Sequence, residues 1–358
     1  RSMKRKPKVN FLSVSIGAPV IGLAEEKAVL RALREKRLSQ GKYVKEFEGA
    51  WSSFVGRKFG IAVNSGSSAN LVGFLAMKEY YGWKDGDLVL VPALTFATAV
   101  MPVIQAKLQP VYADVDKRGN ITLANVIAAA RHCPASKIRG LILVHSLGVP
   151  CLEVLNIKKW ADRRGIRILE DACESHGARV NGKRVGAFGD VSTTSFYVAH
   201  NMTTGEGGMI TTDNPALALI CRSFREFGRE IRANPGERYV HLASGPKYDS
   251  RYAFRRLGYN FRMTDIEASI GLVQLAKLER MNNKRRDIIE LYRRQLKDLI
   301  ASGAISLPEE FTHSYNTYYA LQITFEKMPK NCSSLADVAR RLEEAGIEIR
   351  PFMGGNLL

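Results

Sequence analysis

The sequence predicts an α/β fold with a mostly parallel sheet that helices cover on both faces. Short apolar runs alternate with longer segments of helical apolar spacing through the first two thirds of the chain. The apolar runs are continuous, which is typical of strands buried on both faces. A length of 358 residues, with 46% hydrophobic and 25% charged residues, indicates a globular protein with a large core and two domains.

The elements follow from this spacing in chain order. Helices are expected over residues 24–38, 45–55, 67–80 (opening in a Ser/Gly turn), 98–105, 125–131 and 152–164, and strands over 60–63, 88–91, 109–113, 140–145 and 167–171. Beyond residue 201 the pattern becomes more antiparallel, at 207–212, and then loop-rich over 227–258.

A long helix over 264–299 is expected to lead into a smaller α+β domain with a strand at 318–325 and a helix at 334–345. We therefore predict an N-terminal arm (1–23), a large domain (24–263) and a small C-terminal domain (264–358). The chain stops soon after a predicted helix, so we expect the small domain to be incomplete.

Composition narrows the class of function. The net charge is +18, but the basic residues are dispersed among carboxylates, without a helix-turn-helix, zinc-finger or RNA-binding signature. A solvated basic surface or a field that attracts a small anionic substrate is expected rather than nucleic-acid binding. No apolar run approaches the roughly 20 residues of a membrane span. Five scattered cysteines without a close pair predict reduced thiols in a cytoplasm, and no metal site.

Four segments carry residue patterns suited to a phosphate-bearing ligand. They are 64–70 (NSGSSAN), 92–96 (PALTF), 169–177 (LEDACESHG) and 195–208 (SFYVAHNMTTGEGG). Small residues that open a helix offer backbone N–H groups to a phosphate. Each segment alone has an ordinary structural explanation: a strand-to-helix turn, a core phenylalanine, a helix-capping aspartate or a structural histidine. Their combination favours a ligand site.

Together with 257–265 (LGYNFRMTD), these segments resemble the DegT/DnrJ/EryC1/StrS family of nucleotide-sugar enzymes that use pyridoxal 5'-phosphate (PLP). The resemblance spans nearly the whole chain and implies the aspartate aminotransferase fold (fold type I). In the aminotransferases of that family a lysine, which holds PLP as an imine, stands where this chain has His200. Imidazole cannot form that bond, but it can carry protons near neutral pH.

The resemblance also implies roles for individual residues. Asp171 would keep the cofactor ring nitrogen protonated, and Ser195 would contact its phosphate, as would the 64–70 turn. Asn260 would reach the phosphate in the neighbouring subunit's site, which implies a homodimer. The predicted site residues are His200 and Asp171 for catalysis, Gly66, Ser67, Phe96, Asp171, Glu174, Ser195 and Asn260 for the cofactor, and Arg350 for the substrate. Glu174 stands where many relatives carry Gln or His.

Histidine in place of lysine is typical of the 3-dehydratases of deoxysugar pathways. One kind acts on CDP-4-keto-6-deoxyglucose and carries an iron–sulfur cluster, and the other acts on GDP-4-keto-6-deoxymannose without one. A cluster needs about four thiolates, and the cluster-bearing kind has cysteines in the loop that corresponds to residues 227–236. That loop contains no cysteine in this chain. The pattern therefore favours the second kind, which serves lipopolysaccharide O-antigen synthesis. In the resting state the second kind of enzyme holds its cofactor as pyridoxamine 5'-phosphate (PMP). It uses the histidine as base and regenerates PMP from L-glutamate.

Three alternatives stay open from the sequence. The chain could be a nucleotide-sugar aminotransferase whose lysine has been replaced, or the CDP-4-keto-6-deoxyglucose dehydratase. It could also be a non-catalytic binding or regulatory protein that has retained the cofactor contacts.

Overall fold

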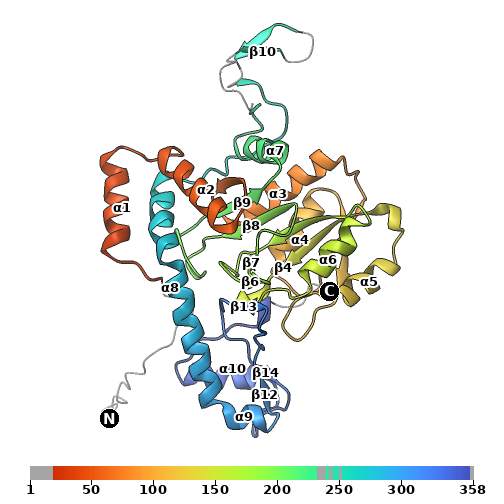
Figure 1. The fold of residues 1–358 in the computed structure, drawn as a ribbon, viewed down its shortest axis with the longest axis vertical. Coiled ribbons are helices and arrows are strands. Elements are labelled where there is room, and N and C mark those ends of the chain that lie inside the picture. The colour runs from red at the N-terminus through yellow and green to blue at the C-terminus, as the bar shows by residue number, and fades with distance from the viewer. Residues whose placement is uncertain (1–18, 232–238, 242–244, 250–251, 355–358) are drawn as a thin grey trace, which may run out of the picture.

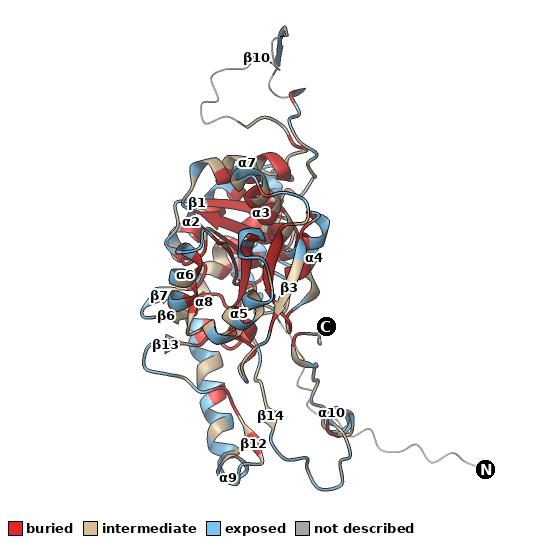
Figure 2. Cartoon of the chain, turned by 90° about the vertical axis from the view of Figure 1, so that its right-hand side faces the viewer, coloured by how far each residue is buried: buried red, intermediate tan, exposed pale blue. Residues whose placement is uncertain are grey.

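A seven-stranded sheet forms the centre of the computed structural model, which describes residues 19–231, 239–241, 245–249 and 252–354. The strands are β1 (Phe59–Val63), β2 (Leu88–Pro92), β3 (Gln109–Ala113), β4 (Ile138–Val144), β5 (Arg167–Asp171), β8 (Val191–Ser195) and β9 (Gly208–Thr212). Their spatial order is β1-β9-β8-β5-β4-β2-β3. Figure 1 shows helices around this sheet, and Figure 2 shows its strands as the most buried part of the chain.

The sheet is mostly parallel, as predicted. Strands β2–β3, β2–β4, β4–β5 and β5–β8 pair in parallel, whereas β9 pairs antiparallel with both β1 and β8. The other six strands therefore run in one direction and end at the same edge. The predicted antiparallel character of 207–212 is confirmed in β9.

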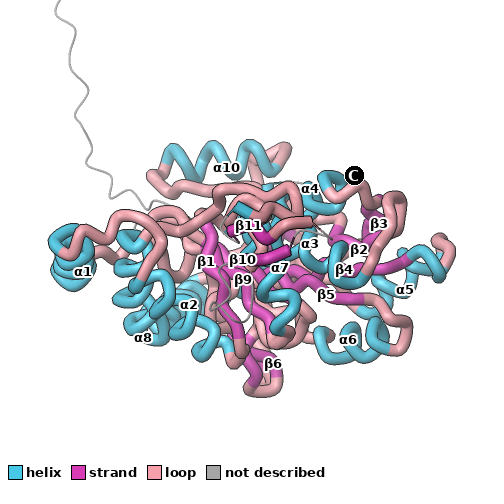
Figure 3. Tube along the Cα trace, turned by 90° about the horizontal axis from the view of Figure 1, so that it is seen from above, coloured by secondary structure: helices cyan, strands magenta, loops and turns pink. Residues whose placement is uncertain are grey.

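Helices form a layer on each face of the sheet, as the view in Figure 3 shows. The first layer contains α3 (Gly66–Tyr81), α4 (Ala97–Gln105) and α7 (Pro215–Arg225), and the second contains α5 (Leu123–Arg131) and α6 (Val154–Asp162). Alternate residues of β1 face opposite sides of the sheet. Ile61 therefore belongs to the hydrophobic cluster that contains residues of α3, and Ala62 belongs to the one that contains residues of α2 (Lys42–Val55). The expected covering of both faces is confirmed.

The long helix α8 (Asp265–Gln295) connects the sheet to the smaller part of the chain (Figure 1). Thr264 and Glu267 form a capping box at its start, which fixes where the helix begins. Its first half packs on α1 (Leu23–Arg34) and α2, and its end meets α9 (Lys297–Ala301). The prediction of one helix to residue 299 was therefore too long. Beyond α9 lie β12 (Ile305–Ser306), β14 (Thr324–Phe325) and α10 (Leu335–Glu344).

The strand predicted at 318–325 is wrong over most of its length. Thr324 and Phe325 pair with β12, but Thr317 and Tyr319 donate backbone hydrogen bonds to the carbonyls of Gly148 and Leu147. These hydrogen bonds hold the start of the segment against residues 147 and 148, which follow β4 of the central sheet, rather than within the smaller domain. The apolar run is thus a connection between the two parts of the chain.

The sequence did not predict α7 or β8. Strand β8 (VSTTS) is fully buried although it is rich in hydroxyl groups, so it lacks the apolar run that marked the other strands. The remaining short elements are β6 (Arg179–Val180), β7 (Lys183–Arg184), β10 (Tyr239–His241), β11 (Lys247–Asp249), β13 (Ser314–Tyr315), η1 (Ala135–Lys137), η2 (Ser146–Gly148) and η4 (Phe352–Gly354). The β10–β11 hairpin falls in the predicted loop and projects from the body (Figure 1).

Most of the predicted N-terminal arm lies outside the described residues, and the end of the chain from residue 355 does too. We retain the boundary between residues 263 and 264 as a proposal, since it coincides with the capping box of α8. None of the helices in the described ranges combines the length and the hydropathy that a membrane span requires.

Candidate active site

The candidate site lies at the sheet edge where the parallel strands end. Gly66 opens α3 just after β1, and Phe96 precedes α4 after β2. Asp171 is the last residue of β5, and Ser195 is the last of β8. In open α/β sheets this edge is where ligands bind, because helix N-termini point toward it.

Gly66 and Ser195 approach each other closely at the start of α3. A Cβ at Gly66 would lie 2.4 Å from the Ser195 Cβ and 3.1 Å from its Cα. Only glycine therefore allows α3 to begin against the end of β8. The Ser65 hydroxyl caps the helix by accepting from the Ser68 N–H, while Ser67 is exposed beside it. A helix N-terminus flanked by two serine hydroxyls is a cradle suited to a phosphate.

Asp171 is buried and held by a short network of hydrogen bonds. Its Oδ2 accepts from the Asn70 side chain at 2.8 Å, and its Oδ1 accepts from the Cys173 N–H at 3.0 Å. Asn70 in turn accepts from the Thr193 hydroxyl of β8 at 2.6 Å. No α-helix follows Asp171 directly, so the helix-cap alternative is wrong. Fixed in this way, the carboxylate is suited to pair with a cationic ring nitrogen.

Glu174 is half-buried three residues beyond Asp171 and accepts from the Leu147 N–H at 2.8 Å. Burial, with a smaller contribution from the Asp171 charge, raises the pKa of its carboxyl to about 7, against the opposing effect of the Leu147 hydrogen bond. Glu174 can therefore exchange a proton near neutral pH. The neighbouring Tyr319 feels its charge, since Glu174 is among the causes that raise the Tyr319 pKa, after burial.

His200 lies in the loop after β8, and its ring is oriented by the backbone. Its Nδ1 is 2.9 Å from the Ser195 carbonyl oxygen, which accepts the Nδ1 hydrogen and leaves Nε2 as the basic nitrogen. The rings of Tyr319 and Tyr197 contact it at centroid distances of 5.2 and 6.0 Å. Burial lowers the pKa of His200, while the Ser195 carbonyl and the Asp171 charge oppose that shift. The lowered pKa favours the neutral form of the imidazole, whose Nε2 can accept a proton.

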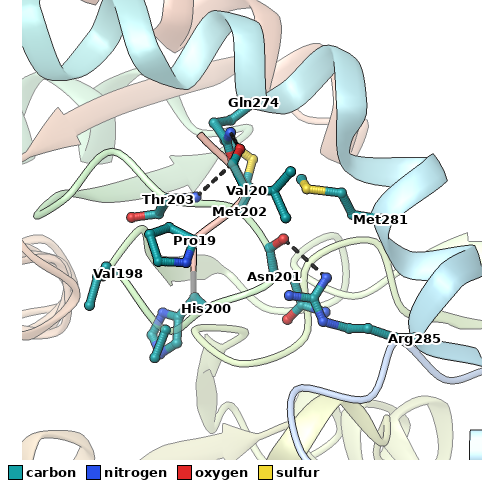
Figure 4. Close-up of a pocket in the computed structure, with 11 residues that line it drawn as sticks. Pro19, Val20, Val198, His200, Asn201, Met202, Thr203, Gln274, Met281 and Arg285 are labelled. Atoms are coloured by element: carbon teal, nitrogen blue, oxygen red, sulfur yellow. Dashed lines mark hydrogen bonds between the residues drawn. The ribbon is translucent and has the colours of Figure 1, made fainter. Parts of the chain in front are cut away.

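A small pocket adjoins His200 on the side of α8 (Figure 4). Asn201, Arg285, Gln274 and Pro19 are among its lining residues. Arg285 donates to the Asn201 carbonyl at 3.3 Å, and Gln274 accepts from the Thr203 N–H at 3.4 Å. These bonds tie the His200 loop to the long helix.

Three predicted residues lie apart from this network. The Phe96 ring is 57% exposed at the start of α4, which leaves a face free for stacking. Asn260 is exposed and forms an isolated antiparallel backbone β-bridge with Glu226. Its side chain accepts a hydrogen bond from the Arg262 side chain at 3.0 Å. Arg350 is exposed too, and its charge is a minor contribution that opposes the raised pKa of Tyr319. The contact of Asn260 with a partner subunit stays a prediction.

Sequence reasoning missed Asn70, Thr193 and Tyr319. Asn70 is 2% exposed on the inner face of α3, and a polar residue on a buried helix face is a signal that could have identified it. No comparable signal exists for Tyr319, because the backbone bond to Leu147 that places it joins distant parts of the chain.

The assembled groups suit a planar, phosphate-bearing heterocycle. The cradle at Gly66 could take the phosphate, the Asp171 carboxylate could pair with a ring nitrogen, and Phe96 offers an aromatic face. The side chain at position 200 has no primary amine with which to bind such a ligand covalently.

Comparison with known proteins agrees with this geometry. The model of the DegT/DnrJ/EryC1/StrS aminotransferase family matches residues 19–356. The lipopolysaccharide biosynthesis protein RfbH of Salmonella typhimurium is 32% identical over 367 residues, covering 98% of this chain and 82% of that protein. GDP-4-keto-6-deoxy-D-mannose 3-dehydratase of Yersinia pseudotuberculosis is 32% identical, covering 93% and 83%.

Aminotransferases are similar to nearly the same degree. GDP-perosamine synthase of Vibrio cholerae is 29% identical, covering 88% of this chain and 77% of that protein. Among solved structures, E. coli GDP-4-keto-6-deoxy-D-mannose-3-dehydratase with bound hydrated PLP has a TM-score of 0.83 at 29% identity, covering 95% of this chain and 85% of that one. The predicted aminotransferase fold is thereby confirmed.

Proposed function

We propose a function for this chain, which belongs to the DegT/DnrJ/EryC1/StrS aminotransferase family: it removes the 3-hydroxyl of a 4-keto-6-deoxyhexose linked to a nucleotide diphosphate. The observation that carries the proposal is His200, a base without a primary amine, held on the Ser195 carbonyl within electrostatic range of the buried Asp171 carboxylate. The similarity to GDP-4-keto-6-deoxy-D-mannose 3-dehydratases favours GDP as the nucleotide.

The residues that would hold the cofactor fit PMP or PLP. Gly66, Ser67 and Ser195 would hold the phosphate, and Phe96 would offer its exposed ring to the pyridine. Asp171 would keep the ring nitrogen protonated, and Asn70 and the Cys173 N–H hold that carboxylate in place. When bound, PMP supplies an amine that condenses with the 4-keto group and a ring that accepts the electron pair released at carbon.

His200 moves the proton. With Nδ1 held on the Ser195 carbonyl, Nε2 would be the atom that takes the proton released next to the cofactor's amine. The same Nε2 then returns a proton to the departing 3-hydroxyl, which leaves as water. The lowered pKa of His200 suits both steps, because the neutral form is the base and the charged form is a strong acid. Glu174 is a second group that can exchange a proton near neutral pH.

L-glutamate would return PLP to PMP, and a neighbouring subunit would supply Asn260 to each site. Asn260 is exposed in the single chain, as such a role requires. All five cysteines are unpaired, which suits a reducing cytoplasm. The competing function is amino transfer, which the similarity to GDP-perosamine synthases favours.

Product analysis tests the proposal. The purified enzyme is given GDP- and CDP-linked 4-keto-6-deoxy sugars with and without glutamate, and the products are identified by mass spectrometry and NMR. We expect a 3-deoxy product from the GDP sugar, dependent on glutamate and independent of a flavin reductase. His200→Asn is the matched variant, because it keeps a polar side chain but loses the base.

Other products would redirect the assignment. A 4-amino sugar as the sole product would establish the aminotransferase alternative. Stoichiometric iron, or turnover only with an added reductase, would indicate the CDP-sugar branch. Cofactor binding without any turnover would indicate a binding or regulatory protein.

A further inference from the structure

His176 is a buried histidine next to the candidate site, and its ring nitrogens lack hydrogen bonds of good geometry to the described part of the chain. It lies five residues beyond the end of β5 with an exposed fraction of 1%. Among the described residues, neither ring nitrogen has a hydrogen-bond partner of acceptable geometry. Buried polar groups are almost always paired, and an unpaired one calls for an explanation in strain or function.

Three aromatic rings surround His176. The centroids of Trp51, Phe196 and His200 lie 5.4, 5.7 and 5.9 Å from its own, and the His200 ring is almost perpendicular to it, at 85°. An apolar ring would fill such a site without leaving nitrogens unpaired. Packing alone therefore does not account for the imidazole, and one of its ring neighbours is the candidate base.

His145 provides the contrast within the same protein. It is also fully buried, but its Nε2 lies 2.9 Å from Glu170 Oε1, and its Nδ1 accepts from the Cys151 N–H at 3.0 Å. Both nitrogens are satisfied, as expected of a histidine that serves the fold. The fold can therefore give a buried imidazole two hydrogen bonds of good geometry, and at position 176 it gives none from the described residues.

The charges around the pair place the proton on His200. Burial, followed by the charges of His200 and Arg285, keeps the pKa of His176 well below its usual range. Loose hydrogen bonding to the backbone of Ser195 and Cys173, outside good geometry, opposes that shift. For His200, burial lowers the pKa, while the Ser195 carbonyl and Asp171 raise it. The rings of Tyr197 and Tyr319 complete the surroundings of His200. His176 thus stays neutral when its neighbour takes up a proton.

We propose that His176 is a positioning residue for His200. Its neutral imidazole is a polar neighbour of the protonated form of His200, and its edge-on ring keeps Nδ1 of His200 on the Ser195 carbonyl. No bond forms or breaks at His176, and the proton remains on His200. The inference rests on the proposed function in assigning proton transfer to Nε2 of His200.

The test is His176→Phe in the full-length, PMP-loaded enzyme, since phenylalanine keeps a ring and removes the nitrogens. The chain has six histidines, so the ring protons of His200 can be assigned by single substitutions and titrated by NMR. We expect His200 to titrate at lower pH, because its charged form loses a polar neighbour. We also expect kcat to fall by about tenfold or more, with KM for the nucleotide sugar unchanged and no fall in the thermal midpoint.

Two further substitutions separate this role from a structural one. His313→Phe alters an exposed histidine of the smaller part of the chain and leaves the His200 titration unchanged. His176→Gln restores a donor and an acceptor, so the His200 titration returns toward that of the wild type. This variant also keeps the test available if the phenylalanine enzyme does not fold.

An unchanged His200 titration in folded His176→Phe overturns the inference. A fall in thermal midpoint with normal kcat and titration also overturns it, because that pattern belongs to a purely structural residue. If the wild type dehydrates no sugar, the proposed function fails. The NMR titration still decides whether His176 controls the protonation of His200.

Discussion

Replacing Gly66 by alanine tests whether the start of α3 is the phosphate cradle. The new Cβ would lie 2.4 Å from the Ser195 Cβ, where ordinary contacts begin at 3.4 Å. The obstacle includes the Ser195 Cα at 3.1 Å, so no side-chain rotation relieves it. The helix and the end of β8 must therefore separate by about 1 Å. A misplacement of about 1 Å lowers the rate of a positioned reaction by about 100-fold, which corresponds to about 2.7 kcal/mol. We expect the loss of PMP binding free energy to be of the same size.

We expect Gly66→Ala to bind PMP about 100-fold more weakly, as measured by equilibrium dialysis. Gly49→Ala is the matched control, because Gly49 is exposed in α2 and a Cβ there meets nothing within 4 Å. That control should bind PMP normally and gain up to about 1 kcal/mol in the free energy of unfolding. A Gly66→Ala enzyme that binds PMP within about threefold of the wild type, under 1 kcal/mol, would refute the assignment of the cradle.

Three further predictions concern the site and its support. His200→Lys should bind the cofactor as an imine, turn yellow and lose dehydration; a colourless protein, or full dehydratase activity, would contradict the role of His200. The raised pKa of Glu174 means that folding favours its protonated form, so the unfolding free energy of cofactor-free wild type should fall as pH rises from about 4.5 to about 7. In urea denaturation, Glu174→Gln should lack this decrease. If the unfolding free energies of the variant and the wild type depend on pH in the same way, the raised pKa of Glu174 is contradicted. Arg225 is 2% exposed and bonds Glu48 at 2.6 Å, so Arg225→Ala should lower the unfolding free energy by about 3–5 kcal/mol; a loss below about 1 kcal/mol would show that the pair is solvated.

Much of the fold could be predicted because its signals are local. The apolar runs of β2, β4 and β5 and the spacing of α3 are visible within a few residues. Strand β8 could not be found in this way, because its serine and threonine residues are buried by partners elsewhere in the chain, such as Asn70 for Thr193. The strand predicted at 318–325 fails for the same reason, since the bond of Tyr319 to Leu147 overrides its apolar pattern.

The sequence by itself determined which chemistry the site can hold. It places Asp171 at the end of a strand, small residues at the start of a helix, and at position 200 an imidazole that cannot form an imine. These properties belong to single residues and to their neighbours along the chain, so no knowledge of the tertiary fold is needed to recognise them.

Only the tertiary structure decided how these groups act on one another. Asn70 reaches Asp171 across 101 positions in sequence, and Thr193 reaches Asn70 across 123. The contact between His176 and His200 likewise depends on the packing of Trp51 from α2 and Phe196 from the end of β8. Such contacts arise from the order of strands and the packing of helices, which are set by the free energy of the whole core rather than by local sequence.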